Sequence, residues 1–296
     1  MTATCKICGS TALRVAYEGP IRLGRFGTLS PEPHAVRQCE QCGVQALPPI
    51  MGDLSEYYEG AQYREEVNAG AAAADYYRLH DAEQARNVGL TGTARFRGKV
   101  VMDVGCGAGS FLDAVQGYAG KVVAIEPSGE FQEELRHKGF ETFSYPQDAH
   151  ATWAGKVDVA VCFSVIEHVE DPVGFLRSIR ALLAPGGACL LTTPNAGDLL
   201  VAALPGAYPS FFYRKVHLWY FDRMSLQRAF SEAGFSACEV AGHHRFGLGN
   251  FLLWLREQRP SGQASLAAIT PAMDAVWKSE LERTFACDYL FATAIA

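Results

Sequence analysis

The stretch of sequence that decides the fold is Val100-Val101-Met102-Asp103-Val104-Gly105-Cys106-Gly107-Ala108-Gly109-Ser110-Phe111-Leu112. An apolar run of strand length leads to an acid and then to three glycines at alternate positions, after which apolar residues recur at helical spacing. A strand, a glycine turn and a helix begin a βαβ unit, where open parallel sheets bind nucleotides. Glycine suits this turn because a Cβ would block the approach of a ligand to the backbone.

The spacing of the glycines separates two classes of nucleotide site. Gly105, Gly107 and Gly109 form G-x-G-x-G, whereas the dinucleotide-binding fingerprint is G-x-G-x-x-G. With Asp103 in front of it, the string MDVGCGAGSFL resembles the first motif of the class I S-adenosylmethionine (SAM) dependent methyltransferases. Three later strings, VIEHVEDP, LLAPGG and LLTTPN, are similar to that family in order and spacing, and the resemblance covers residues 99–195. It implies an α/β fold with a Rossmann-like sheet of seven strands, and SAM as the cofactor.

Candidate cofactor-binding residues follow the predicted strands. Glu126 ends the buried run 121–125, about where a nucleotide-binding sheet places a carboxylate against ribose hydroxyls. Ser164 follows the apolar run 157–163, which we interpret as the central strand beside the glycine loop. A shorter strand, 140–143, precedes the loop in which an adenine-contacting side chain would lie. The predicted SAM-binding residues are Asp103, Gly105, Gly107, Gly109, Glu126, Gln147, Asp148 and Ser164.

Four cysteines near the N-terminus form two matched pairs. Cys5-x-x-Cys8-Gly and Cys39-x-x-Cys42-Gly together supply four thiolates, enough to close a tetrahedral zinc site. Four protein ligands leave no open catalytic position, so this zinc would be structural, and a segment this small could hardly fold without it. The alternative is four buried or redox-active cysteines, which matched spacing makes the weaker interpretation.

Composition limits the partners of the protein. The formal charge is −6 over 296 residues, which argues against a large nucleic-acid footprint, since that needs a basic face. No apolar run approaches the length of a membrane-spanning helix, and the first ten residues lack the apolar core of an export signal. Nine cysteines without such a signal indicate a reducing compartment, and we expect a cytoplasmic protein.

Three regions are predicted along the chain: a zinc-ribbon-like module at 1–50, a connector and helical cap at 51–98, and the methyltransferase domain at 99–296. The last contains two insertions, at about 195–222 and 243–283. The first insertion is rich in aromatic residues. Because an insertion here would overhang the methyl donor, it is our main candidate for the acceptor pocket.

Histidine is the usual general base near neutral pH when the methyl acceptor is a hydroxyl. His217 lies in the aromatic insertion and is our first candidate, with His168, after the central strand, as the second. Tyr213 is a candidate hydrogen-bonding partner of the acceptor. Each of the two histidines has a structural alternative: His217 could pack beneath Trp219, and His168 could be a structural residue at a helix end.

The cysteine pairs, the core motifs and the segments VHLWYFD and HRFGLGNFLLWL resemble bacterial methyltransferases with an N-terminal zinc-binding domain, many of which act in sugar, polysaccharide or natural-product pathways. The resemblance implies O-methylation of a small-molecule acceptor, a sugar or nucleotide-sugar hydroxyl, and hence a role in carbohydrate biosynthesis. C-methylation of a sugar and methylation of a natural product are the alternatives within this class. A zinc-bearing RNA methyltransferase and a non-catalytic SAM-binding assembly module are the alternatives outside it. A homodimer is possible.

Overall fold

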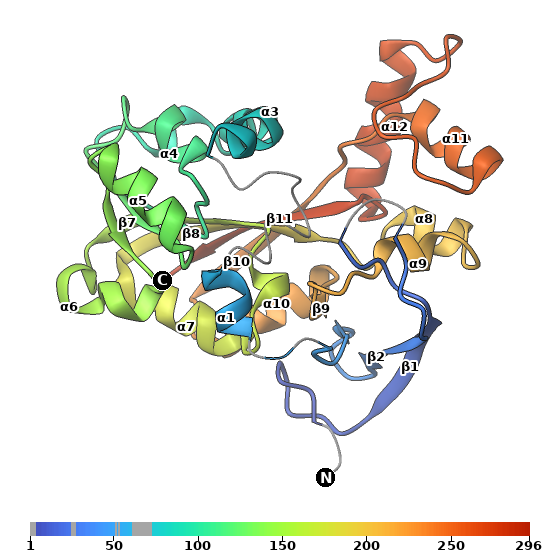
Figure 1. Ribbon diagram of the computed structural model, residues 1–296, viewed down its shortest axis with the longest axis horizontal. Coiled ribbons are helices and arrows are strands. Elements are labelled where there is room, and N and C mark those ends of the chain that lie inside the picture. Colours follow the sequence, from blue (N-terminus) through green and yellow to red (C-terminus); the bar gives the residue numbers. More distant parts are fainter. Residues whose placement is uncertain (1–3, 25–27, 51, 53, 61–72) are drawn as a thin grey trace. The chain divides into compact units, whose positions relative to one another are not determined.

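The computed structural model describes residues 4–24, 28–50, 52, 54–60 and 73–296 (Figure 1). Part of the predicted connector, residues 61–72, therefore lies outside the described residues. The chain forms two compact units. Unit 1 comprises Met1–Pro49, Thr192–Ala229 and Glu239–Ala292, and unit 2 comprises Ile50–Leu191, Phe230–Cys238 and Thr293–Ala296.

The chain forms a seven-stranded sheet, as predicted, and five of its strands lie within residues 99–195. Its order is β10-β11-β8-β7-β4-β5-β6, and β4 pairs in parallel with both β5 and β7. The order reverses direction at β4, because β5 and β6 follow on one side and β7 and β8 on the other. Such a reversal opens the crevice in which α/β sheets bind ligands. The strands are β4 Val100–Val104, β5 Lys121–Ile125, β6 Glu141–Phe143, β7 Val157–Phe163, β8 Leu183–Pro194, β10 Ala237–His243 and β11 Tyr289–Ile295.

Helices follow the strands of unit 2, and α4 and α7 cover opposite faces of the sheet (Figure 1). Helix α7 begins where its sequence predicts: Asp171 accepts a hydrogen bond from the Gly174 N–H at 3.0 Å, and Pro172 occupies the first helical position. The helices of this unit are α1 Leu54–Glu59, α3 Ala73–Thr91, α4 Ser110–Val115, α5 Gly129–His137, α6 His150–Trp153 and α7 Pro172–Leu182, while α10 Arg223–Glu232 begins in unit 1 and ends in unit 2.

Strand β8 begins at Leu183, directly after the end of α7, and therefore includes the Pro185-Gly186-Gly187 segment. The Ala296 N–H donates to the Gly187 carbonyl at 2.9 Å within this segment. The final helix, α12, spans Pro271–Thr284, and Thr270 caps it by accepting from the Met273 N–H.

The N-terminal strands of unit 1 pair with a strand from the aromatic insertion. β1 Leu13–Gly19, β2 His34–Cys39, β3 Gln45–Ala46 and β9 Trp219–Tyr220 form one sheet in that order. Gln45 lies opposite Tyr220 in the antiparallel pair β3–β9. The cysteine-bearing segment therefore shares a sheet with a segment that lies far away in the sequence.

The hydrophobic core of unit 1 draws on the same distant segments. Ile21, Val36 and Leu47 pack in one buried cluster with Tyr220 and Trp254. Trp254 lies on α11 Leu248–Glu257, while α8 Leu199–Ala203 and α9 Tyr208–Phe212 supply further members of the cluster. Sheet pairing and core packing thus join residues of the predicted zinc module to both predicted insertions. No helix in the described ranges is long and apolar enough to cross a membrane.

Candidate active site

The glycine loop between β4 and α4 has a backbone that only glycine adopts easily. Gly105 has φ +79° and Gly107 has φ +55°. A Cβ added to Gly105 would lie 2.4 Å from Cγ2 of Val165, which follows the central strand β7. Conformation and crowding therefore both require glycine here, and the loop lies against the carboxyl end of β7.

Glu126 holds this loop in place from the end of β5. Its carboxylate accepts hydrogen bonds from the Gly107 N–H and the Ser128 N–H, each at 2.9 Å, and the residue is buried. The Gln132 side chain donates to the Glu126 carbonyl at 2.7 Å. The acid predicted to bind ribose hydroxyls thus also orders the backbone of the glycine loop. Its contact with a ribose stays a prediction.

Asp103 lies at the base of the same loop. Burial, and secondly the charge of Glu126, raise its pKa to about 8. In the ligand-free protein at neutral pH the carboxyl therefore keeps its proton and can donate a hydrogen bond as well as accept one.

Two tyrosines of α3 contact the glycine loop, and sequence reasoning did not assign them to the site. The Tyr76 ring lies against Gly107, where an added Cβ would meet it at 2.4 Å, and the Tyr77 hydroxyl donates to the Ala108 carbonyl at 2.8 Å. Their helix lies in the predicted connector and helical cap at 51–98, and these contacts bring it against the glycine loop. No local spacing distinguishes these tyrosines from surface residues.

Three other predicted cofactor residues lie in loops after strands. Ser164, directly after β7, has φ +56°, an unusual backbone for a residue other than glycine and one that concentrates at functional sites. Gln147 and Asp148 lie in a short 3₁₀ turn, Pro146–Ala149. There the Asp148 carboxylate accepts from the Tyr145 N–H at 2.9 Å. Their contacts with SAM stay predictions.

The predicted catalytic residues belong to different units. His168 lies in unit 2, where its Nδ1 is 2.8 Å from the hydroxyl of Tyr58 on α1. His217 and Tyr213 lie in unit 1. Nη1 of Arg214 is 3.4 Å from Nε2 of His217, and the Tyr213 hydroxyl donates to Oε1 of Gln45 at 2.7 Å.

A cavity of about 90 Å³ lies within unit 1. Both predicted insertions contribute to it. Aromatic residues form a large part of its wall, together with smaller apolar residues and four polar ones. The aromatic residues are Tyr208, Phe211, Phe246, Phe251, Trp254 and Trp277, and the polar ones are Asp198, His244, Asn250 and Asp288. Nε1 of Trp277 is buried and has no hydrogen-bond partner in the described part of the chain. A ligand in this cavity could satisfy that donor.

Two buried carboxylates at this cavity have pKa values shifted in opposite directions. The Asp198 carboxylate accepts from the Tyr208 hydroxyl at 2.7 Å, and burial raises its pKa to about 6. Burial also acts on Asp288, but Arg245 and His244 hold its pKa well below the usual value. Nε of Arg245 donates to Asp288 at 2.7 Å, and Nδ1 of His244 is 3.2 Å from Oδ1 of Asp288. The Asp288 backbone N–H also donates to Nδ1 of His244 at 3.2 Å, so Asp288 contacts this buried histidine of the cavity through both its carboxylate and its backbone.

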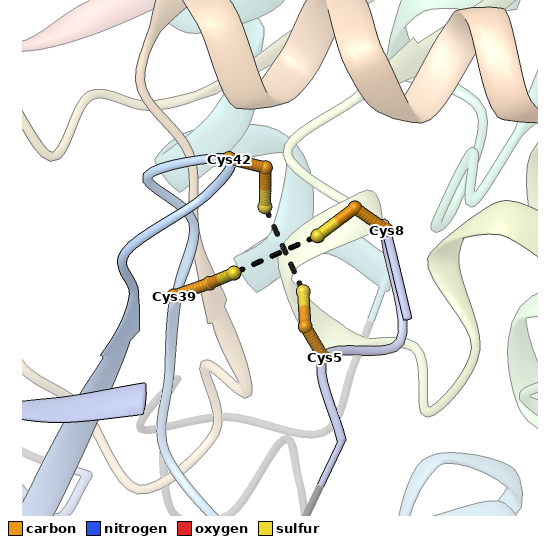
Figure 2. Close-up of side chains that lie close together, drawn as sticks. All are labelled: Cys5, Cys8, Cys39 and Cys42. Carbon is orange, nitrogen blue, oxygen red and sulfur yellow. Dashed lines mark hydrogen bonds between the residues drawn. The ribbon is translucent and has the colours of Figure 1, made fainter. Parts of the chain in front are cut away.

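The four predicted metal ligands converge in unit 1 (Figure 2). Their sulfurs all lie within 4.8 Å of one another, and Sγ of Cys5 is 3.6 Å from Sγ of Cys42, as is Cys8 from Cys39. Zinc–sulfur bonds of about 2.3 Å in a tetrahedron separate the sulfurs by roughly 3.8 Å, so the cluster has the right size for Zn²⁺. Gly9 and Gly43, which follow the pairs, have φ +74° and +83° and close each turn.

Comparison with known families places the chain. A sequence-family profile described as "Methyltransferase domain" matches residues 76–240, more than half of the chain. The chain belongs to this methyltransferase family. It is a SAM-dependent methyltransferase, and the glycine loop with Asp103 and Glu126 is where the family resemblance places the cofactor.

Relatives named ubiquinone biosynthesis O-methyltransferase show partial similarity to this methyltransferase. The protein from Psychrobacter arcticus is 29% identical over 199 residues, which cover 61% of this chain and 71% of the relative. The one from Thiobacillus denitrificans is 28% identical over 180 residues, covering 57% and 78%. The match to Psychrobacter cryohalolentis is 32% identical over 133 residues and spans 40% of this chain and about half, 48%, of that relative.

Solved structures share the fold of this methyltransferase at low identity. A chain from a Haloferax volcanii complex that contains the Trm112 methyltransferase activator is 16% identical, with a TM-score of 0.51, and the match covers 83% of this chain and 99% of the other. A SAM-dependent methyltransferase from Thermotoga maritima has a TM-score of 0.50 and 16% identity, covering 75% and 94%. These matches confirm the predicted class I sheet.

Replacing Gly105 by alanine should weaken binding of S-adenosylhomocysteine at least about tenfold, because the new Cβ meets Val165 and the left-handed backbone becomes strained. Isothermal titration calorimetry measures the change. Gly117→Ala is the matched control, since Gly117 has open space around its Cβ position and no positive φ. Equal affinity in the two variants would contradict the assignment of the loop to the cofactor.

Proposed function

We propose that this methyltransferase transfers a methyl group to a hydroxyl of a small molecule that binds in the cavity of unit 1. The observation that carries this proposal is the cavity itself, with aromatic walls, two carboxylates and a buried histidine. Aromatic faces cover the apolar face of a ring, while carboxylate oxygens accept hydrogen bonds from hydroxyls. The names of the relatives, O-methyltransferases, support an oxygen acceptor.

A sugar or nucleotide-sugar is the acceptor that we propose. Hydroxyls at the rim of a sugar ring could donate to Asp198, while the ring lies against Tyr208 or Trp254. The competing acceptor is a ubiquinone precursor, which the name of the relatives suggests. The matches to those relatives cover only part of this chain, so the relatives' substrate does not determine the substrate here.

Methyl transfer depends here on alignment and on removal of one proton. SAM supplies an electrophilic methyl group on a positively charged sulfur. The chain must orient the acceptor oxygen in line with that methyl group and exclude water, which can supply much of the rate. A general base would accept the hydroxyl proton as the oxygen–methyl bond forms and the sulfur–methyl bond breaks, with S-adenosylhomocysteine as the leaving group.

Three histidines are candidates for the base. His217 and His168 are those that the sequence predicts, with Tyr213 as a partner of the acceptor. The structure adds His244, which lines the cavity and is held by Asp288. A carboxylate that orients an imidazole fixes its ring and stabilises the imidazolium that forms, so His244 is the base we propose for an acceptor in this cavity.

We also propose that the cysteine cluster holds one structural Zn²⁺. Spacing, convergence and the separation of the sulfurs support this ligand set. Its four thiolates would complete the coordination of the metal and leave it no role at the reacting atoms. Its effect would be to stabilise unit 1, and thus the walls of the cavity.

Labelled SAM should transfer its methyl group to a nucleotide sugar in a panel that also contains a ubiquinone precursor with a free aromatic hydroxyl. Product is measured by radioactivity and located by mass spectrometry. Transfer to the ubiquinone precursor alone would contradict the sugar assignment. No transfer to any hydroxyl acceptor, although S-adenosylhomocysteine binds, would contradict O-methylation.

His244→Ala should lower kcat about a hundredfold on the acceptor so identified, because general bases contribute typically 10²–10⁴-fold. The pH–rate profile of the wild type should show that kcat requires one deprotonated group. The profile of His244→Ala should lack this dependence. His137→Ala is the control, since His137 is an exposed residue at the end of α5. If His217→Ala or His168→Ala lowered kcat by a comparable factor while His244→Ala did not, the proposal that the acceptor binds in the cavity would be contradicted.

A further inference from the structure

Two arginines of unit 1 lie side by side although they are far apart in the sequence. The Arg22 N–H donates to the Tyr213 carbonyl at 2.9 Å, and the Lys215 N–H donates to the Arg22 carbonyl at 2.9 Å. These bonds form a parallel bridge between Arg22 and Arg214. One arginine comes from the loop between the cysteine pairs and the other from the aromatic insertion. Backbone hydrogen bonds of unit 1 therefore hold the two arginines next to each other.

Among the residues that the structure describes, neither guanidinium has an anionic partner. The Nε atoms of Arg22 and Arg214 are buried and have no hydrogen-bond partner in the described part of the chain. Within the described ranges, no carboxylate forms an ion pair with either residue. The acids of the neighbouring cavity are otherwise engaged: Asp198 accepts from Tyr208, and Asp288 is paired with Arg245.

This arrangement is costly in the absence of a ligand. Buried charges are normally paired, and two like charges at close range repel each other. Burial, and secondly the charge of Arg214, lower the pKa of Arg22 to about 9. Stacking on Phe211, whose ring centre is 4.2 Å from Cζ of Arg22, offsets part of the cost but leaves the buried N–H donors unsatisfied.

The surroundings suit an anion that carries hydrogen-bond acceptors. Nε2 of His217 lies 3.4 Å from Nη1 of Arg214, so an imidazole lies beside one of the guanidinium groups. Both arginines keep part of their surface exposed to solvent. A planar guanidinium binds two oxygens of a phosphate at once, and a pair of them matches the charge of about −2 that phosphate groups carry.

We propose that Arg22 and Arg214 form a binding site for a phosphate or diphosphate group, and that this group belongs to the methyl acceptor. The second part rests on the proposed function. Phe211 connects the two sites, because its ring stacks on Arg22 and also lines the aromatic cavity. A nucleotide sugar would fit this juxtaposition, with its sugar in the cavity and its diphosphate on the arginines.

Inorganic pyrophosphate tests the site on the full-length, metal-loaded protein. We expect saturable binding in calorimetry and a rise in Tm with pyrophosphate concentration. Arg22→Gln and Arg214→Gln should each weaken binding about ten- to a hundredfold, as expected when one charge-assisted hydrogen-bonding group is lost. Arg37→Gln, at an exposed position of β2, should bind as the wild type does.

Thermal stability without pyrophosphate separates a binding role from a structural one. Because the charge of Arg22 is unpaired, Arg22→Gln should keep or raise the Tm in pyrophosphate-free buffer, whereas the loss of a purely structural arginine would lower it. The absence of saturable pyrophosphate binding by the wild-type protein would by itself overturn the proposal. Equal affinity in all variants would also overturn it, as would binding of benzoate as tight as that of pyrophosphate.

The failure of this site and the failure of the proposed function give different results. Arginine-dependent pyrophosphate binding without methyl transfer to any hydroxyl acceptor would leave the anion site in place and overturn both O-methylation and the assignment of the phosphate to the acceptor. Methyl transfer to an acceptor without phosphate, together with no pyrophosphate binding, would leave the function in place and overturn the site.

Discussion

The pairing of β3 with β9 is the constraint on which the rest of unit 1 depends. It joins Gln45 and Ala46, just after the second cysteine pair, to Trp219 and Tyr220 in the aromatic insertion. Because of this pairing, Tyr213 can bind Gln45, Arg22 can lie beside Arg214, and the core can combine residues from three distant segments. A cysteine cluster that fixes the N-terminal strands would therefore also fix the segments that form the cavity. A structural metal at the N-terminus would thus affect acceptor binding by stabilising the cavity, without taking part in the reaction.

In unit 2, the buried carboxylate of Glu126 stabilises the glycine loop. Its two hydrogen bonds to backbone N–H groups hold the glycine loop at the carboxyl ends of the central strands. Tyr76 and Tyr77 of α3 close against the same loop. Under the proposed function, SAM binds in unit 2 and the acceptor binds in the cavity of unit 1. Such a division allows one cofactor site to serve many acceptors, because changes in the acceptor unit leave the glycine loop intact.

The fold of unit 2 could be predicted because its information is local. The apolar runs that became β4, β5 and β7, the glycine spacing and the cap at Asp171 are each contained in a few consecutive residues. The clustering of the four cysteines could be predicted for the same reason. What the sequence did not reveal are pairings between distant segments: β3 with β9, Arg22 with Arg214, Tyr58 with His168, and His244 with Asp288. Each partner in these pairs has an ordinary local pattern, and only the tertiary fold makes it part of a site.

We propose that the cysteine cluster and the walls of the cavity fold as one unit. Amide hydrogen exchange, measured by mass spectrometry before and after a chelator removes the metal, tests this coupling. We expect about one zinc per chain and, after its removal, faster exchange not only in residues 4–49 but also in Trp219–Tyr220 and in α11, with β4 and β5 unchanged. Faster exchange confined to residues 4–49 would contradict it, as would metal content well below one zinc per chain in the freshly purified protein.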